Sequence, residues 1–370
     1  MAFPGRAKGL LGKFYPCHRG VSRLKEYYPR VLHICIIGQY QKQGGITMCT
    51  AATYCTKDHY FGRTLDVDFH CDQCIAVTPR RFPFHFRRVA PLDRHYAMIG
   101  MAFIQDGVPL YYDATNEKGL SIAGLNFPGN ACCHPVEPGR DNVAPYELIP
   151  WLLGQCSTVD EARGLLDRLN VADLPYSDTL PLASLHWMLA DRERALVVES
   201  VAEGLRVYDN PAGVMTNNPP FPYQQLYLSE FMNLTSRPPV NRLSPGLELA
   251  PYSCGFGAIG LPGDLSSSSR FVRAAFTRAN SLSGDSEAES VAQFFHILGS
   301  VTQARGCDRT DRGCQTTVYT SCCNTDKGIY YYNTYNNSQL SAVDLRREEL
   351  DGSRLVTYPM QTEPRIYWQN

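Results

Sequence analysis

The architecture follows from a strand pair that opens with Met48-Cys49-Thr50-Ala51-Ala52-Thr53-Tyr54-Cys55. Thr and Tyr favour strands, and the four residues Thr56-Lys57-Asp58-His59 then form a turn. The strand pattern resumes at Tyr60-Phe61-Gly62-Arg63-Thr64-Leu65-Asp66. Two such runs on either side of a short polar turn predict a β-hairpin.

Further strands are predicted after this hairpin, over 74–78, 96–104, 108–112 and 120–125. Turn residues separate them, as in Gln105-Asp106-Gly107 and Asn116-Glu117-Lys118-Gly119. A succession of strands joined by short turns indicates an antiparallel meander.

The rest of the chain alternates between pairs of helices and blocks of strands. Apolar spacing predicts helices over 144–155, 158–169, 269–282 and 288–298, and Thr158 with Glu161 forms a capping-box pattern. Strands are predicted over 185–189, 195–200, 205–208, 316–321, 328–334 and 339–344. Strands in blocks favour antiparallel sheets. We therefore expect an α+β fold, a four-layer α-β-β-α sandwich, as a single domain over 49–370.

The composition excludes several classes of protein. The chain has 370 residues, of which 44% are hydrophobic and 19% charged, as in ordinary globular proteins. A formal net charge of −1 argues against a general nucleic-acid binder. No apolar run approaches the ~20 residues of a membrane-spanning helix. The 14 cysteines of so long a chain predict free thiols in a reducing compartment, the cytoplasm.

The first 48 residues differ from the rest in charge. They hold eight Lys or Arg and one acid, a net +7, against −8 for the remainder. We expect this segment to be absent from the mature protein, for one of two reasons. Codons for Gly44-Gly45 can form a purine-rich ribosome-binding site, which makes Met48 the true start. Alternatively, a propeptide is removed between Met48 and Cys49.

Cys49 is the candidate nucleophile. Removal of Met48, which the small side chain of Cys49 permits, would leave a thiol and a free α-amine on one residue. A thiolate is a strong nucleophile, and an α-amine with a pKa of about 7.7–8.0 can serve as a base near neutral pH. One residue then supplies both catalytic groups. The alternative is a small buried side chain at the start of a strand.

Arg63 and Asp66 lie on the strand that pairs with Cys49. Their spacing puts them on opposite faces of a regular strand, so a bulge or the strand end is needed to bring both to one site. Arg63 near the thiol would favour the thiolate, and Asp66 could accept a hydrogen bond from the α-amine. The alternative is a surface ion pair at a strand end.

In these and other motifs, residues 48–370 resemble the choloylglycine hydrolase family, which comprises the bile salt hydrolases and penicillin V acylases. The resemblance extends in family order along the whole segment. It is carried by Met48-Cys49-Thr50, Phe61-Gly62-Arg63-x-x-Asp66, Asn116-Glu117-Lys118-Gly119-Leu120, Ala123-Gly124-Leu125-Asn126-Phe127-Pro128, Leu185-His186-Trp187-Met188, Thr216-Asn217-x-Pro219, Leu261-Pro262-Gly263-Asp264, Ser269-Arg270-Phe271 and Gly328-Ile329-Tyr330-Tyr331-Tyr332-Asn333-Thr334.

The resemblance implies the N-terminal-nucleophile hydrolase fold and a set of catalytic roles. Cys49 is the nucleophile and its α-amine the base, with Arg63 and Asp66 beside them. Asn217 would donate a side-chain N–H to the oxyanion, and Arg270 would complete the charge network. Asn217 as a turn former and Arg270 as an anion clamp at a helix start remain the alternatives.

The resemblance also indicates a substrate, a conjugated bile acid. Asn126 would be a further donor near the scissile amide, or else a turn former. An Asn there is typical of bile salt hydrolases, whereas many penicillin V acylases carry Tyr. Leu65, Ile104 and Phe127 flank the motif residues and are candidate liners of an apolar steroid pocket, or else part of the core. The predicted reaction is hydrolysis of a glycine or taurine conjugate through a thioester, with acyl transfer to other amines as a side activity.

Two alternative functions stay open at this point. One is penicillin V or N-acyl-homoserine lactone acylase activity on the same fold. The other is a non-catalytic thiol protein that binds metal through His70, Cys71 and Cys74. The prediction itself includes no cofactor and no metal, no nucleic-acid or membrane partner, and a homotetramer by family analogy.

Overall fold

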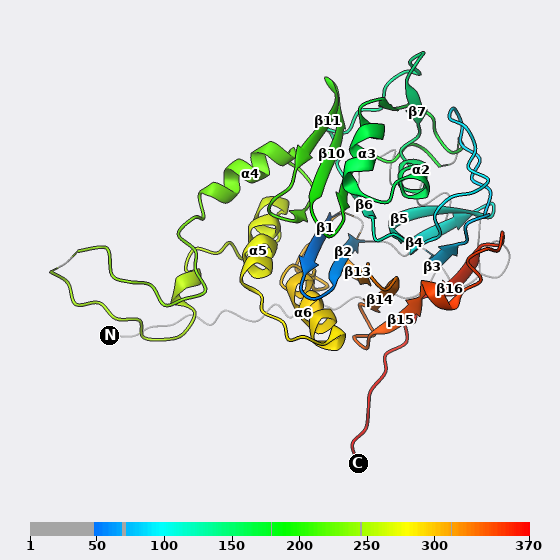
Figure 1. Cartoon of the computed structure of the whole chain (residues 1–370). Helices are drawn as coiled ribbons and strands as arrows, with labels where there is room; N and C mark the ends of the chain where they lie inside the picture. Colours follow the sequence, from blue (N-terminus) through cyan, green and yellow to red (C-terminus); the bar gives the residue numbers. More distant parts are fainter. Residues whose placement is uncertain (1–47, 69–71, 179, 245, 312) are drawn as a thin grey trace, which may run out of the picture.

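Two large antiparallel sheets form the centre of the computed structural model (Figure 1), which describes residues 48–370 except 69–71, 179, 245 and 312. The first sheet has the strand order β12-β1-β2-β13-β14-β15. Its strands are β1 (Met48–Cys55), β2 (His59–Val67), β12 (Val214–Met215), β13 (Thr316–Asn324), β14 (Ile329–Thr334) and β15 (Ser341–Asp344). The leader, predicted over residues 1–48, lies outside the described residues apart from Met48.

The second sheet has eight strands in the order β11-β10-β9-β6-β5-β4-β3-β16. They are β3 (Gln73–Thr78), β4 (Met98–Gln105), β5 (Val108–Asn116), β6 (Ser121–Asn126), β9 (Leu185–Ala190), β10 (Ala195–Val201), β11 (Gly204–Asp209) and β16 (Val356–Pro359). A separate parallel pair joins β7 (Asp141–Val143) to β8 (Leu169–Val171).

Helices cover the outer face of each sheet. They are α2 (Leu148–Gln155), α3 (Val159–Leu166), α4 (Phe221–Ser229), α5 (Ser267–Asn280) and α6 (Glu287–Gly299), with single 3₁₀ turns η1 (Phe256–Ala258) and η2 (Leu345–Arg347). Helices α5 and α6 contact β1, whereas α2 contacts β5 and β6 of the second sheet (Figure 1). The predicted four-layer α-β-β-α sandwich of α+β class is thereby confirmed.

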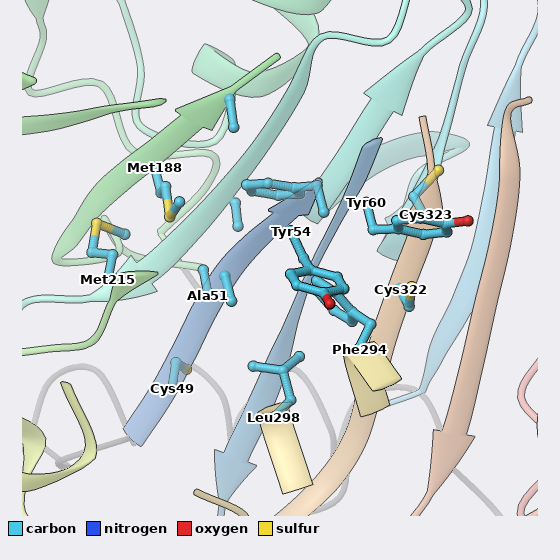
Figure 2. Packing of buried hydrophobic residues seen from close by; sticks show 14 of the residues in the cluster. Cys49, Ala51, Tyr54, Tyr60, Met188, Met215, Phe294, Leu298, Cys322 and Cys323 are labelled. Carbon is cyan, nitrogen blue, oxygen red and sulfur yellow. The ribbon is translucent and has the colours of Figure 1, made fainter. Parts of the chain in front are cut away.

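Two apolar clusters hold these layers together. The first lies between the sheets and extends to α5 and α6, and it includes Cys49, Met188 and Phe294 (Figure 2). The second fills the space between the second sheet and α2 and α3, with Trp187 on the sheet and Trp151 on α2. No described helix is both long enough and apolar enough to cross a bilayer.

The predicted elements differ from the observed ones mainly at their ends. Thr158 caps α3 by accepting from the N–H of Glu161 (3.2 Å), as its sequence pattern predicts. Helix α2 begins four residues later than predicted, because the Glu147 carboxylate binds the N–H of Ala144 (3.0 Å) ahead of the helix. Helix α4 and the short strands β7, β8, β12 and β16 were not predicted.

Candidate active site

The hairpin of β1 and β2 places Cys49 and Arg63 on the same face of the first sheet. Cys49 lies opposite Leu65, and Ala51 lies opposite Arg63, so these four side chains share one face. Gly62 allows β13 to pass close by, since a Cβ there would lie 2.0 Å from the carbonyl oxygen of Ser321. The close approach fixes β2 between its neighbours and thereby fixes Arg63.

Arg63 is buried and points at the thiol. Its Nη2 donates to Cys49 Sγ at 2.6 Å, and its Nε donates to the carbonyl of Thr64 at 3.1 Å. Its Nη1 donates to two carbonyl oxygens of the second sheet, those of Tyr112 (3.2 Å) and Gly124 (2.5 Å). The guanidinium is therefore held by both sheets with one N–H directed at sulfur.

Asn217 and Arg270 come to Cys49 from distant parts of the chain. Strand β12 pairs with β1 at Ala51, so Asn217, two residues after β12, lies beside the start of β1. Its Oδ1 accepts from the backbone N–H of Cys49 (2.8 Å) and from Arg270 Nη2 (2.8 Å). Arg270, on the first turns of α5, also donates through Nη1 to the carbonyl of Cys49 (2.6 Å) and to Thr50 Oγ1 (2.7 Å).

Asp66 reaches this centre from the opposite face of the sheet. Its Oδ1 accepts from Thr317 (2.5 Å) and its Oδ2 from Thr64 (3.1 Å), whose hydroxyl in turn accepts from the N–H of Thr50 (3.1 Å). The bulge expected from the Arg63 and Asp66 spacing lies on the partner strand, where β13 carries one extra residue between Thr317 and Tyr319.

Burial and charge act in opposite directions on the ionisable groups of this site. Burial raises the pKa of the Cys49 thiol, and the positive charge of Arg63 opposes that rise. Burial likewise raises the pKa of Asp66 to about 6, against the charge of Arg270. Burial lowers the pKa of Arg270, and the charge of Asp66 counters it.

The arrangement meets the requirements of nucleophilic catalysis at residue 49. A thiol 1% exposed has a cation at its sulfur, and the nitrogen of the same residue has a carboxamide acceptor. With a free α-amine at that nitrogen, Asn217 Oδ1 would orient a base close to the sulfur. The acceptor for the backbone nitrogen of Cys49 is thus Asn217, and not Asp66 as the sequence analysis expected. The Asp66 carboxylate accepts from threonine hydroxyls instead.

The four residues predicted to bind substrate do not all lie beside Cys49. Leu65 lies directly across from Cys49, and the carbonyl of Asn126 accepts from Asn217 Nδ2 at 2.7 Å. Phe127 is fully buried and stacks on His186 with ring centroids 4.2 Å apart. Ile104 is half-buried and packs against the second cluster, on the α2 side of the second sheet. The structure does not bring Ile104 together with Cys49.

Three threonines join the site although the sequence analysis assigned them no role. Thr50, Thr64 and Thr317 supply the hydroxyls that bind Arg270 and the Asp66 carboxylate. The first two lie within the motif strands, so their alternation with Cys49 and Arg63 was a usable signal. Thr317 had no such signal, because its strand is paired with β2 only by the tertiary fold.

Of the three residues of the alternative metal site, the structure describes only Cys74. His70 and Cys71 lie outside the described residues, and Cys74 is a half-buried thiol 3.7 Å from the carbonyl of Ala102. Within the described part of the chain, no three His, Cys, Asp or Glu side chains stand together as a possible metal site.

Comparison with known proteins adds to this geometry. Residues 49–358 match the family model of linear amide C–N hydrolases, choloylglycine hydrolase family. A bile salt hydrolase/transferase of Lactiplantibacillus plantarum is 51% identical over 324 residues, which is 87% of this chain and all of that protein. A bile salt hydrolase/transferase of Clostridium perfringens is 39% identical over 318 residues, 84% of this chain and 96% of the relative.

Solved structures give the same result for the fold. A variant of the conjugated bile acid hydrolase from Clostridium perfringens superimposes with a TM-score of 0.81 at 37% identity. The match covers 87% of this chain and 100% of that one. The two large sheets and their helices are therefore common to both proteins.

Proposed function

The chain belongs to the choloylglycine hydrolase family of linear amide C–N hydrolases, and on that premise we propose that it hydrolyses glycine- and taurine-conjugated bile acids. The observation that supports this best is the pairing of Cys49 Sγ with Arg63 Nη2 at 2.6 Å, while Cys49 N faces Asn217 Oδ1 at 2.8 Å. Relatives with 51% and 39% identity bear the name bile salt hydrolase/transferase. Because the chain belongs to a family of enzymes, the alternative of a non-catalytic, metal-binding thiol protein does not hold.

The proposed reaction begins with the Cys49 thiolate, which attacks the amide carbonyl of the conjugate. Arg63 stabilises the thiolate through its Nη2 hydrogen bond. The α-amine, oriented by Asn217, takes the thiol proton and passes it to the leaving nitrogen of glycine or taurine. Water activated by the same amine then hydrolyses the thioester, and another amine in place of water gives acyl transfer.

Donors for the tetrahedral oxyanion come from the pair Asn126 and Asn217 in this proposal. One N–H of the Asn217 carboxamide is engaged by the Asn126 carbonyl (2.7 Å), which joins the two residues rigidly. The second proton of the same nitrogen and the Asn126 side chain would complete the oxyanion site, where aligned donors supply a large part of acyl-transfer catalysis. Leu65, which lies across from Cys49, would line the pocket, whereas Phe127, fully buried against His186, belongs to the core.

Substrate choice is the direct test of this function. We expect the purified mature enzyme to hydrolyse glycocholate and taurocholate with kcat/KM at least about 10²-fold above that for phenoxymethylpenicillin, since a pocket built for one acyl group discriminates by a few kcal/mol. Release of glycine and taurine, of 6-aminopenicillanic acid, and of homoserine lactone from an N-acyl substrate would be measured side by side. A preference for the penicillin or the lactone would assign the chain to the alternative acylases.

The mature chain is proposed to begin at Cys49, with 49–370 as one catalytic domain and the basic segment before it absent. The mechanism supports this, because a peptide bond at Cys49 N removes the base. A cytoplasmic location is proposed as well. It is supported by the eleven described cysteines, all of which are free thiols.

A homotetramer is the proposed assembly, and one segment of the surface supports self-association. The arm of residues 230–244 and 246–265 between α4 and α5 extends away from both sheets (Figure 1). It carries large apolar side chains that are mostly exposed, with Met232 at 83% and Tyr252 at 92%. Exposed apolar surface concentrated in one projecting segment is typical of an interface between protein chains.

Substitution on this arm tests the assembly. We expect Met232→Glu combined with Tyr252→Glu to convert a tetramer into smaller species in light scattering after size-exclusion chromatography, because buried carboxylates oppose association. Leu282→Glu is the matched control, since Leu282 is 88% exposed but lies between α5 and α6, outside the arm. A wild-type monomer, or an arm variant that remains tetrameric, would contradict the proposal.

A further inference from the structure

A second buried carboxylate lies close to the active site, on the far side of Arg63. Asp113 is on β5 of the second sheet and is 2% exposed. Its oxygens accept from three hydroxyls of the first sheet: Tyr319 at 2.9 Å, Tyr330 at 2.7 Å and Ser321 at 3.2 Å. The carboxylate therefore bridges the two sheets behind the nucleophile.

The contacts connect Asp113 to Arg63 by two routes. The carbonyl of Tyr112, the residue next to Asp113, accepts from Arg63 Nη1 at 3.2 Å. Ser321 Oγ accepts from the backbone N–H of Arg63 at 3.1 Å while it donates to Asp113. The hydroxyls around Asp113 carry no charge, so Arg63 is the cation that these contacts bring to it.

Electrostatics couple the same groups. Burial raises the pKa of Asp113, and the positive charge of Arg63 is the largest influence that opposes the rise. Burial also disfavours the charged form of Arg63, but the neighbouring Cys49, Tyr319 and Asp113 outweigh it and raise the pKa of Arg63 above its usual value. Cys49 on one side and Asp113 on the other thus interact with one guanidinium.

The net charge of the buried groups around Arg63 also affects the ionisation of Cys49. Arg63 and Arg270 are the cations of the cluster, and Asp66 and Asp113 are its carboxylates. With both carboxylates ionised and the α-amine of residue 49 neutral, the four charges cancel while Cys49 is a thiol, and a thiolate gives the cluster a net negative charge. Without the charge of Asp113, and with the α-amine still neutral, the charges cancel when Cys49 is a thiolate. A net charge in a buried site is costly, so loss of the Asp113 charge favours the thiolate.

We propose that Asp113 is a positioning residue that acts through Arg63, and that by sharing this cation with Cys49 it sets the pH at which the nucleophile ionises. The inference rests on Cys49 as the reactive thiol of the proposed function. Its test uses alkylation of that thiol and not turnover of any substrate.

The experiment compares the mature chain with the Asp113→Asn variant, which keeps the size and an acceptor oxygen but removes the charge. The rate of Cys49 alkylation by iodoacetamide would be followed from pH 4 to pH 9 on the Cys49 peptide by mass spectrometry. We expect the midpoint of the rate to move to lower pH by about one unit, since loss of a competing anion favours the thiolate. An unchanged or higher midpoint in a folded variant would overturn the proposal.

The other ionisable groups near Cys49 are the same in the wild type and in the Asp113→Asn variant. They are Arg63 and Asp66 on β2, Arg270 on α5, Tyr319 on β13 and the α-amine of residue 49. Asp66, with a pKa of about 6, titrates within the measured range in the wild type and in the variant alike. The difference between the two midpoints therefore reports the charge of Asp113.

If Asp113→Asn does not fold, two variants on strand β14 test the same proposal. Tyr330→Phe removes a hydroxyl from Asp113, so the carboxylate binds a proton more readily, and the Cys49 midpoint should fall by a smaller amount. Tyr331→Phe is the control, because Tyr331 lies on the opposite face of β14 and donates to Glu287 on α6 at 3.0 Å. Equal midpoints for these two variants would refute the proposal. A midpoint shift in a protein that fails to hydrolyse bile salts would instead refute the proposed function alone.

Discussion

The Cys49→Ala variant is expected to lose at least about 10³-fold in kcat/KM for glycocholate, because it removes the thiol to which Arg63 donates a hydrogen bond and with it the proposed nucleophile. The Cys49→Ser variant is expected to lose nearly as much. A serine hydroxyl has almost the size of the thiol but ionises far less readily beside Arg63. Release of glycine measures the rates, and circular dichroism confirms that both variants are folded.

The matched control for this prediction is Cys55→Ser on the same strand. Cys55 ends β1 as an exposed thiol, so its replacement should leave hydrolysis unchanged. Wild-type turnover by Cys49→Ala would show that another group forms the acyl-enzyme, and the mechanism proposed above would then be wrong. Loss of activity in Cys55→Ser as well would indicate a general effect on the protein and not on the nucleophile.

Blocking the α-amine of Cys49 is expected to reduce activity by about 10²–10⁴-fold, the usual contribution of a general base. A removable fusion joined directly to Cys49 provides the test, since a protease that cuts immediately before Cys49 converts the peptide nitrogen into an amine. In the structure that nitrogen lies 2.8 Å from Asn217 Oδ1. Cleavage should therefore release an amine that is already oriented, and hydrolysis should rise with the fraction cleaved.

Two controls accompany the fusion experiment. The same fusion on the Cys49→Ala variant should gain no activity after cleavage, which shows that the gain requires the thiol of residue 49. Intact mass and N-terminal sequencing of the full-length gene product would show whether active protein begins at Cys49. Full activity with Met1 still attached would contradict both the over-long start and the removed propeptide.

Local patterns were enough for much of the fold. The hairpin of β1 and β2 follows from two runs of strand-forming residues on either side of a polar turn, and the meander from β3 to β6 follows in the same way. Helix α4 was missed because its apolar residues do not gather on one face. Strand β12 was missed because two residues are too few to form a pattern, and pairing with β1 makes the strand.

The face of a sheet on which a residue lies was harder to predict. Ile104 follows a motif strand closely in sequence, but it alternates with the side chains that face α2 rather than Cys49. Asn217 was expected to use its N–H at the site. In the structure its oxygen faces Cys49 N, and one N–H binds the Asn126 carbonyl. Such orientations depend on which partner each atom meets, and a single sequence does not contain that information.

The sequence by itself determined that Cys49 lies beside Arg63. Cys49 and Arg63 are 14 residues apart on adjacent strands, so the hairpin register alone brings them to one face. Only the tertiary structure decided the rest. Asn217 and Arg270 are 168 and 221 residues from Cys49, and packing of β12 and α5 against β1 places them there. The second sheet brings Asp113 behind Arg63 in the same way, because contacts between layers arise from burial of whole faces and not from any local pattern.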